Sequence, residues 1–392
     1  MRLNKNLFKN ISIVIIGMYA FLNYTNNEQT PLRILFIVGH FPSPSQIFIL
    51  NSIIGLIDKG HKVSIFAFHK DDYKNIDPRI IEYDLLHKTT YSKSVKKLIY
   101  YDYDIIFCQF GYLAKRIVEE PLLEEWLKRR KLVVCFRGAD ISSRIKANPQ
   151  MYKNLFKFVD LCLPVCSYFK KPLIASGCPS NKIIVHHSAI NCNQFFFNPR
   201  KKPLDNEVIR LITVCRLVKK KGIDYAIKAL ARVIKKHKNI HFTIVGEGPE
   251  RNYLKLLIHQ LKLDKHVTLK GWATQEEVVS LLNQSHIFVL PSHKAPDGNE
   301  EGIPNALKEA MAMGLITIAT WHAGNPELID DTVSGFLVPE KDYSKLAQII
   351  EYVIENPQNW ERIGLAARKK VEKTFETKKA IEKLEKLFFE LW

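Results

Sequence analysis

Short apolar runs alternate with segments of helical periodicity along most of the chain, and this alternation constrains the fold more than any other feature. The first unit has a buried strand at Arg33–Gly39, a helix at Ser45–Lys59 that Gly60 ends, and a second buried strand at Lys62–Phe68. Because a helix connects the two strands, they are expected to pair in parallel. The sequence therefore predicts an α/β fold whose helices cover both faces of a parallel sheet.

The alternation occurs twice and is interrupted once. Asn198–Asn206 is polar, contains two prolines and has no apolar period, so we predict a linker there. Before it, further strands are expected at Asp104–Phe107, Leu132–Phe136, Leu161–Pro164 and Ile183–His186. After it, strands are expected at Ile209–Val214, His241–Val245, Val267–Leu269, Ile287–Leu290 and Ile316–Ala319, helices at Ile223–Lys235, Glu250–Leu261, Gln275–Asn283 and Pro304–Met313, and a largely helical tail from Lys345 to Trp392.

The two series predict two Rossmann-like, doubly wound domains at residues 31–198 and 199–377, behind an extension of residues 1–30. Ligands of such sheets bind at the carboxyl ends of the strands, so we expect a cleft between the domains. The length of 392 residues fits two or three domains. With 46% hydrophobic and 25% charged residues, the composition excludes a disordered chain, a collagen-like repeat and a polytopic membrane protein.

The formal net charge of +18 indicates an anionic partner. Residues 1–198 hold 27 of the basic and 15 of the acidic residues, so the excess is larger in the first half. No basic and aromatic motif accompanies the charge, and a nucleic acid is therefore not expected as the partner. A merely lysine-rich solvated surface is the alternative interpretation.

A short apolar run at residues 11–22 follows Arg2, Lys5 and Lys9. It is shorter than the roughly 20 residues that a spanning helix needs. Three interpretations stay open: an interfacial or marginal membrane anchor, a secretory or type II anchor signal, and an inert extension.

Seven cysteines are present, an odd number without C-x-x-C spacing. They lie mostly among apolar residues and are expected to be buried thiols in a reducing compartment.

The most informative motif runs from Glu301 to Gly314, Glu-Gly-Ile-Pro-Asn-Ala-Leu-Lys-Glu-Ala-Met-Ala-Met-Gly. Pro304 suits a helix start, and a helix start is an anion site. Glu301 is expected in the loop before the helix and Glu309 within it, where carboxylates accept hydrogen bonds from hydroxyl pairs such as those of a ribose or a hexose. The alternative is one capping and one surface glutamate.

Arg216-Leu-Val-Lys-Lys-Lys-Gly222 follows a strand and opens the next helix. Arg216 and Lys221 can both point at phosphate oxygens, or they belong to a solvated basic loop. Val245-Gly246-Glu247-Gly248-Pro249 lacks the third glycine of a dinucleotide fingerprint and favours a tight turn. In the first domain, Phe136–Asp140 and Phe41–Gln46 also follow strands, so both segments can line the cleft.

Together these residues resemble the retaining GT-B glycosyltransferases of family 4. The family pattern has two glutamates eight positions apart, with Gly-aromatic/aliphatic-Pro after the first and Glu-Ala-Met-Ala-x-Gly at the second. It is matched by Glu301, Gly302, Ile303, Pro304, Glu309, Ala310, Met311, Ala312 and Gly314. The family's Arg and Lys match Arg216 and Lys221, and its Val-Gly-x-Gly-Pro turn matches Val245 to Pro249. Pro291-Ser292, Gly324-Asn-Pro-Glu327 and Gly335-Phe-Leu-Val-Pro339 also fit.

Within that family the chain is similar to the exopolysaccharide, colanic-acid-like branch. The resemblance rests on Phe41-Pro42 with Ser45 and Phe48, Cys108-Gln-Phe-Gly111, Phe136-Arg-Gly138 with Asp140-Ile-Ser142, and Ser176-Gly-Cys-Pro179. Four positions depart from the usual pattern: Gln46 replaces Glu, Arg137 replaces His, Cys215 replaces Gly, and Ile316 replaces Pro.

The resemblance implies a metal-independent hexosyltransferase, without a cofactor, that moves a sugar from a nucleotide-diphosphate sugar to a saccharide or lipid-linked acceptor. Arg216, Lys221 and the helix start at Ile303 would hold the diphosphate, and Glu309 the ribose. Glu301 would hold the sugar, and Arg137 the sugar or leaving phosphate. Donor-binding residues would be Arg216, Lys221, Gly246, Glu301, Gly302, Ile303, Pro304 and Glu309, and acceptor-binding residues Ser45, Gln46 and Asp140.

The same resemblance implies that the final helix, about residues 378–392, crosses back onto the first domain. A cytoplasmic location on the inner face of the membrane is expected, because bacterial nucleotide sugars are cytosolic. The partner would then be an anionic membrane surface, and residues 11–22 would be a possible anchor. A non-transferring nucleotide-sugar-binding protein and an epimerase of the same fold stay open as alternatives.

Overall fold

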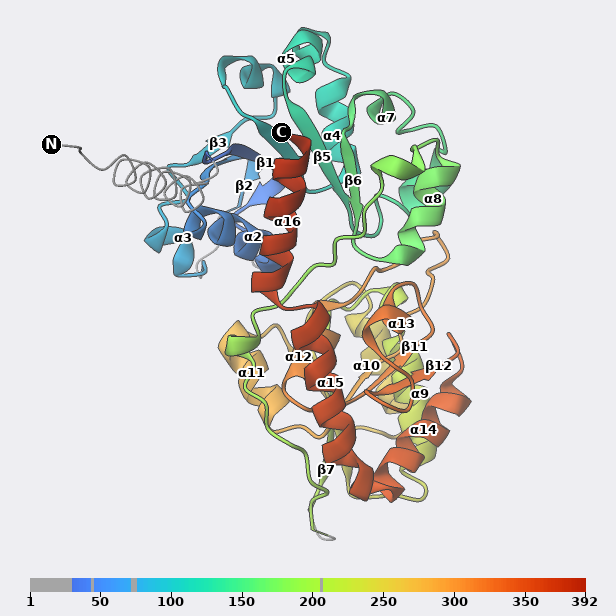
Figure 1. Cartoon of the computed structure of the whole chain (residues 1–392). Helices are drawn as coiled ribbons and strands as arrows, with labels where there is room; N and C mark the ends of the chain where they lie inside the picture. The colour runs from blue at the N-terminus through green and yellow to red at the C-terminus, as the bar shows by residue number, and fades with distance from the viewer. Residues whose placement is uncertain (1–29, 44–45, 72–75, 205–206) are drawn as a thin grey trace, which may run out of the picture.

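Two parallel sheets, one above the other in Figure 1, form the frame of the protein. The computed structural model describes residues 30–43, 46–71, 76–204 and 207–392. Within them the first sheet has the order β3-β2-β1-β4-β5-β6 and the second the order β12-β11-β10-β7-β8-β9. The sequence prediction of two doubly wound α/β sheets is confirmed.

The strands of the first sheet are β1 (Arg33–Phe41), β2 (Lys62–Lys70), β3 (Thr89–Tyr91), β4 (Ile105–Cys108), β5 (Lys131–Phe136) and β6 (Leu161–Pro164). Those of the second are β7 (Ile209–Val214), β8 (Ile240–Val245), β9 (Val267–Gly271), β10 (Ile287–Leu290), β11 (Ile316–Thr320) and β12 (Phe336–Val338). Nearly all strand residues of β4, β5, β10 and β11 are buried, as parallel strands covered on both faces require.

The first sheet is covered by α2 (Ile47–Asp58), α3 (Arg79–Glu82), α4 (Gly111–Val118), α5 (Glu124–Lys128), α6 (Ser143–Ala147), α7 (Leu155–Phe158) and α8 (Lys170–Ala175). The second carries α9 (Ile223–Val233), α10 (Arg251–Gln260), α11 (Gln275–Asn283), α12 (Asn305–Ala312), α13 (Asn325–Leu328), α14 (Tyr343–Glu355) and α15 (Trp360–Thr374). Among the described residues no helix combines the length and the apolar character needed to cross a bilayer. The apolar run at residues 11–22 lies outside the described residues.

One predicted strand is wrong and two strands were not predicted. Ile183–His186 makes only an isolated bridge, from Ile183 to Cys162. The segment still runs beside β6, since the His186 N–H donates to the Pro164 carbonyl oxygen at 3.0 Å. Its side chain turns to the last helix, where His186 Nε2 lies 2.9 Å from the Ala380 carbonyl oxygen. The unpredicted strands, β3 and β12, are three-residue edge strands, too short to show a period of two.

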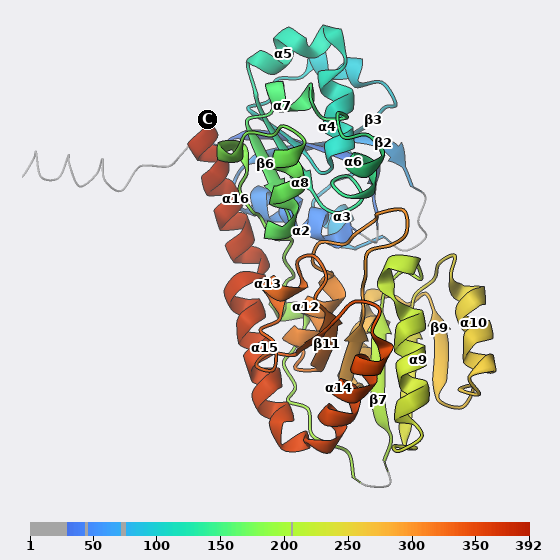
Figure 2. The ribbon, with the colours of Figure 1, turned by 90° about the vertical axis from the view of Figure 1, so that its right-hand side faces the viewer.

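The last helix, α16 (Thr377–Leu391), returns from the second domain to the first. Figures 1 and 2 show it in red, continuing upward from α15 along the first sheet. Its apolar face, with Leu384 and Phe388, joins the core that α2 forms with β1. Lys59 of the first domain donates a 2.6 Å hydrogen bond to Glu385. The chain thus crosses twice between the sheets, once before β7 and once before α16.

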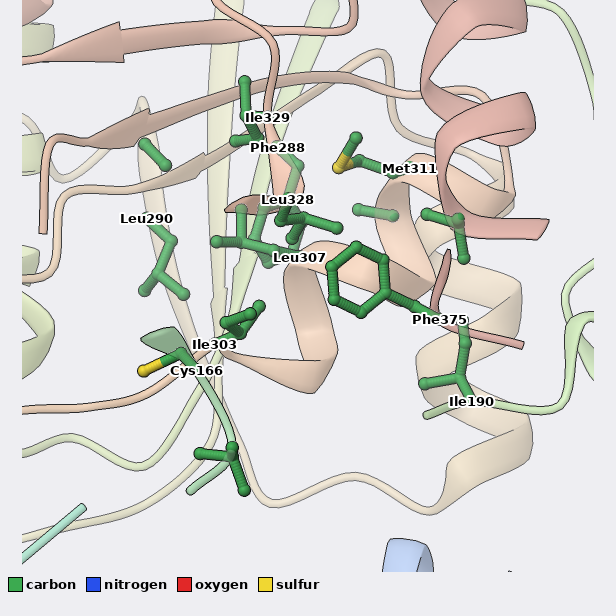
Figure 3. Packing of buried hydrophobic residues seen from close by; sticks show 14 of the residues in the cluster. Cys166, Ile190, Phe288, Leu290, Ile303, Leu307, Met311, Leu328, Ile329 and Phe375 are labelled. Carbon is green, nitrogen blue, oxygen red and sulfur yellow. The ribbon is translucent and has the colours of Figure 1, made fainter. Parts of the chain in front are cut away.

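The apolar core continues from one domain into the other. Figure 3 shows Cys166 and Ile190, from the first domain and its exit segment, beside Ile303 and Leu307 of the second, with Phe375 between α15 and α16 closing the group. All five are at most 6% exposed. Because buried apolar contact is favourable in proportion to its area, this junction stabilises the arrangement in which the two carboxyl edges meet.

Candidate functional site

Loops at the carboxyl ends of the two sheets touch each other. After β5, Ser142 Oγ accepts the backbone N–H of Glu300 at 3.1 Å. Tyr168, after β6, donates its hydroxyl to the Glu300 carboxylate at 2.7 Å. A Cβ added to Gly302 would lie 2.5 Å from Val165, so only glycine allows this approach. The loop before α12 is therefore in direct contact with the first domain.

Lys221 and Glu301 form an ion pair at this contact. The Lys221 Nζ atom lies 2.5 Å from Glu301 Oε1, and the Lys221 side chain is 9% exposed. Burial acts to raise the pKa of Glu301, but the charges of Lys221 and Lys220 outweigh it and hold the pKa below its ordinary value. Glu301 is thus a carboxylate at neutral pH, with a buried ammonium group beside it.

Arg216 lies on the loop after β7 with an exposed side chain, and it makes no ion pair with any described residue. The turn at Val245–Pro249 supports this loop from behind. Gly246 has φ 130°, and a Cβ there would lie 2.0 Å from the Cys215 carbonyl oxygen. Because its N–H already donates to the Gly271 carbonyl oxygen at 2.7 Å, Gly246 shapes the loop that carries Arg216; direct donor contact by Gly246 stays a prediction.

Helix α12 begins beside the ion pair. Pro304 occupies its N-cap position and the first helical residue is Asn305, one residue after the first residue of the predicted helix Pro304–Met313, so Ile303 lies in the loop before the helix. Ile303 itself is 6% exposed and packs in the core between the domains. No side chain caps this helix, so its first N–H groups remain to meet an anion.

Glu309 lies one turn into α12 beside a buried lysine. Burial raises the pKa of Glu309 to about 7, while the Lys308 charge acts in the opposite direction. Lys308 is fully buried and donates to the Ser188 carbonyl oxygen (2.6 Å), the Ser188 hydroxyl (2.9 Å) and Asn305 Oδ1 (2.9 Å). Burial lowers the pKa of Lys308 to about 7, while the Glu309 charge acts in the opposite direction. The three oxygen acceptors tie α12 to the segment that leaves the first domain.

Arg137 projects from the loop after β5 and is held by neighbours of its own domain. Its Nη2 donates to Gln109 Oε1 at 2.6 Å, and its guanidinium lies 4.3 Å from the centre of the Phe48 ring. It also lines a cavity with His186, Ser188 and residues of α16. These contacts fix a cation at the junction of the two domains, and burial lowers its pKa.

The predicted acceptor residues differ in their surroundings. Asp140 is 2% exposed, and its carboxylate accepts the N–H groups of Arg137 (3.0 Å), Gly138 (2.9 Å) and Gly111 (3.2 Å). It therefore shapes the Arg137 loop, and its acceptor contact stays a prediction. Gln46 has a buried Oε1 with no partner among the described residues, which fits an acceptor hydroxyl. Ser45 lies outside the described residues.

Several residues at this contact were not singled out from the sequence. Lys220 donates to Asn299 Oδ1 at 3.2 Å, next to the Lys221 pair. Glu327 of the Gly-Asn-Pro-Glu motif accepts from the Ser167 N–H at 2.6 Å and lies 2.9 Å from His187 Nε2. The motif could have drawn attention to Glu327, but its partners lie at least 140 positions away in the chain. No group of three or more His, Cys, Asp or Glu in the described residues is placed to hold a metal ion.

Comparisons with known proteins agree with this arrangement. Residues 194–370 match the family model described as glycosyl transferases group 1. The amylovoran biosynthesis glycosyltransferase AmsK of Erwinia amylovora is 33% identical, with 88% of this chain and 96% of the relative covered. The putative colanic acid biosynthesis glycosyltransferase WcaL of Escherichia coli is 31% identical over 81% of this chain and 89% of its own.

The fold agrees as well. The crystal structure of Anabaena HepE in complex with UDP matches with a TM-score of 0.76 and 19% identity, covering 92% of this chain and 100% of that one. The resemblance that the Glu301–Gly314 motif indicated is thus confirmed by relatives that span most of the chain. The chain belongs to the group 1 glycosyltransferases, the family 4 enzymes of GT-B fold.

Proposed function

We propose that the protein is a retaining, metal-independent hexosyltransferase that moves a sugar from a nucleotide-diphosphate sugar to a saccharide or lipid-linked acceptor in cell-surface polysaccharide synthesis. The observation that carries the proposal is the buried Lys221–Glu301 pair beside the N-terminus of α12. The names of AmsK and WcaL support a role in exopolysaccharide synthesis. The UDP and UDP-glucose complexes of HepE support a nucleotide-sugar donor.

The chemistry follows from where charge develops. The bond between the anomeric carbon and the diphosphate oxygen breaks, and a new bond to the acceptor oxygen forms on the same face of the sugar. The departing diphosphate oxygen takes the acceptor proton, so no separate general base is assigned. Lys221, Arg216 and the first N–H groups of α12 stabilise the diphosphate as its charge grows. Arg137 adds a cation from the first domain.

A thermal-shift screen of nucleotide sugars tests the donor half of the proposal. Ligand at 100 times its dissociation constant adds about 2.7 kcal/mol to stability, so the correct donor should raise the melting temperature clearly. The nucleoside diphosphate alone should also stabilise the protein, because it carries the groups that Lys221 and Glu309 are proposed to hold. If no nucleotide sugar stabilises the protein, the donor assignment is wrong.

Donor affinity should depend on pH through Glu309. The free carboxyl has a pKa of about 7, and only the carboxylate can accept both ribose hydroxyls. The donor therefore favours the deprotonated form, and its affinity should rise about tenfold from pH 6 to pH 8, as linkage requires. Calorimetry with the donor from the screen measures this. Glu309→Gln should bind weakly with a flat profile; an equally steep profile in that variant would remove Glu309 as the cause.

We also propose that the amino edge of the first sheet rests on an anionic membrane. Exposed apolar residues gather there on the segments before β4 and β5: Ile99 is 44% exposed, Tyr100 84% and Leu122 57%. Lys96, Lys97 and Arg129 lie on the same segments, are exposed, and make no ion pair with a described residue. We call these six residues the amino-edge surface. Apolar side chains flanked by cations fit a bilayer with anionic lipid.

The chain also enters the first domain at this edge. Arg33, the first residue of β1, donates its N–H to Asp104 at 2.7 Å, and Asp104 directly precedes β4. The apolar run at residues 11–22 therefore precedes in sequence a strand that begins at the same edge. Two neighbouring cations on the segment before β5 already have partners. Lys128 pairs with Glu125, and Arg130 packs on Trp126 and pairs with Asp102.

Flotation with vesicles of phosphatidylcholine, with and without phosphatidylglycerol, tests the amino-edge surface. Each lysine near such a surface contributes about 1 kcal/mol, so Lys96→Glu with Lys97→Glu should lower binding to anionic vesicles by more than tenfold. Lys255→Glu with Lys265→Glu, on exposed positions of the second domain, is the charge-matched control and should bind like the wild type. Equal loss in both variants would show that net charge alone, and not this surface, directs binding.

A further inference from the structure

A buried histidine connects the donor loop to a second carboxylate. His322 follows β11 and is 0% exposed. Its Nε2 accepts the backbone N–H of Glu301 at 3.2 Å, and its Nδ1 lies 2.6 Å from Glu340 Oε1. The other Glu340 oxygen accepts the Lys294 N–H at 3.0 Å. Apart from the Glu301 N–H, none of these groups belongs to the motifs that indicate donor binding.

The contacts fix which histidine nitrogen carries the proton. A backbone N–H can only donate, so Nε2 must be the acceptor and Nδ1 must carry the hydrogen. Nδ1–H then donates to Glu340, whose carboxylate can only accept. Glu340 thereby selects the tautomer that can receive the Glu301 N–H.

The Glu301 loop is attached to the segment after β11 at one further point, where the Gly324 N–H donates to the Gly302 carbonyl oxygen at 3.1 Å. Within that segment, the Asn325 N–H donates to the His322 carbonyl oxygen at 2.9 Å. The Glu301 backbone is thus attached to the loop after β11, while its carboxylate is held by Lys221. Two independent supports determine where the Glu301 side chain lies.

We propose that His322, oriented by Glu340, is a positioning residue that holds Glu301 where it meets the donor sugar. The proposal rests on the proposed function, because it assigns His322 to the sugar half of the donor site. His322 does not touch substrate, since its side chain is buried under the loop it supports. Its influence should therefore reach the sugar through Glu301 and leave the diphosphate, held by Lys221 and Arg216, unaffected.

The test compares three substitutions of His322 by turnover and by the affinities for UDP and for UDP-glucose, or for the nucleotide pair from the donor screen. His322→Ala and His322→Asn remove the acceptor at the Nε2 position, and a misplaced reacting group can lower turnover about 100-fold. Affinity for the nucleotide sugar should fall in both, while affinity for the nucleoside diphosphate stays unchanged. His322→Gln can place its Oε1 near the Nε2 position and should recover most of the activity.

His286→Ala is the matched control. His286 also accepts a backbone N–H, that of Arg210 at 3.0 Å, but at the amino end of the second sheet. The His286→Ala variant should keep the wild-type affinities for the nucleoside diphosphate and for the nucleotide sugar. Glu340→Gln keeps the imidazole and removes only the carboxylate, so it tests the same proposal if the His322 variants fold poorly. This variant should weaken binding of the nucleotide sugar and leave binding of the nucleoside diphosphate unchanged.

Two results would overturn the proposal: wild-type kinetics in His322→Asn, or an equal loss of nucleoside diphosphate and nucleotide sugar affinity in His322→Asn and Glu340→Gln. Failure of the proposed function would look different, because the wild-type protein itself would then bind no nucleotide sugar.

Discussion

Replacing Lys221 by alanine is expected to lower turnover about a hundredfold, equivalent to roughly 3 kcal/mol, which is typical of losing one preorganised donor to a developing anion. Lys221 is buried, and its ammonium group lies 2.5 Å from Glu301. Without it, the leaving diphosphate loses a positive charge in a site that largely excludes water, where such a charge acts most strongly. Steady-state kinetics at saturating donor measures the effect.

Lys219 provides the control for this substitution. It lies in the same short 3-10 helix, Lys219–Lys221, but its side chain is exposed. Lys219→Ala removes the same charge from the loop and should leave turnover near the wild-type value. Turnover of Lys221→Ala within a few fold of the control would exclude Lys221 from stabilising the diphosphate.

Removing the Glu309 carboxylate should weaken donor binding about tenfold to a hundredfold, because hydrogen bonds to a charged group contribute roughly 1.5–3 kcal/mol. Glu309 lies in α12, whose N-terminus is proposed to meet the diphosphate. Glu309→Ala should therefore raise the dissociation constant of the nucleoside diphosphate as well as that of the nucleotide sugar. Calorimetry measures both.

A 2′-deoxy nucleoside diphosphate distinguishes lost hydrogen bonds from a disturbed helix. If Glu309 holds the ribose hydroxyls, the deoxy ligand should bind the wild type more weakly than the ribose ligand does. Its affinity should then fall little further when Glu309 is replaced by alanine, because the hydrogen bond is already missing. Fully additive losses would mean that Glu309 acts on the donor through some other contact.

The sequence was most informative where a signal is local. The bounds of β6, β7, α11 and β10 equal the predicted ones, because each is a short apolar or amphipathic run between clear breaks. Lys221 and Glu301 were predicted to share a site because both follow strands of one sheet, and the structure brings them into contact. Periodicity and motif spacing suffice for features of this kind.

The sequence was least informative where partners are distant in the chain. Ile183–His186 has the composition of a strand, yet it serves as the segment on which α16 rests. Three buried polar contacts join residues that no single motif contains. They are Glu300 with Tyr168, 132 positions away, Lys308 with Ser188, 120 positions away, and His322 with Glu301, 21 positions away. Gly246 fits the family turn, but the motif does not show that a Cβ there would lie 2.0 Å from the Cys215 carbonyl oxygen.

Sugar transfer is tested most directly by following donor and acceptor together. Radiolabelled donor is incubated with the protein, with and without membrane lipids that contain lipid-linked saccharide. Label should enter the lipid fraction in an amount equal to the nucleoside diphosphate released, and only when the acceptor is present. An unchanged donor would indicate a binding protein, and conversion of the donor to an isomeric nucleotide sugar without acceptor would indicate an epimerase; either result would exclude the proposed transfer.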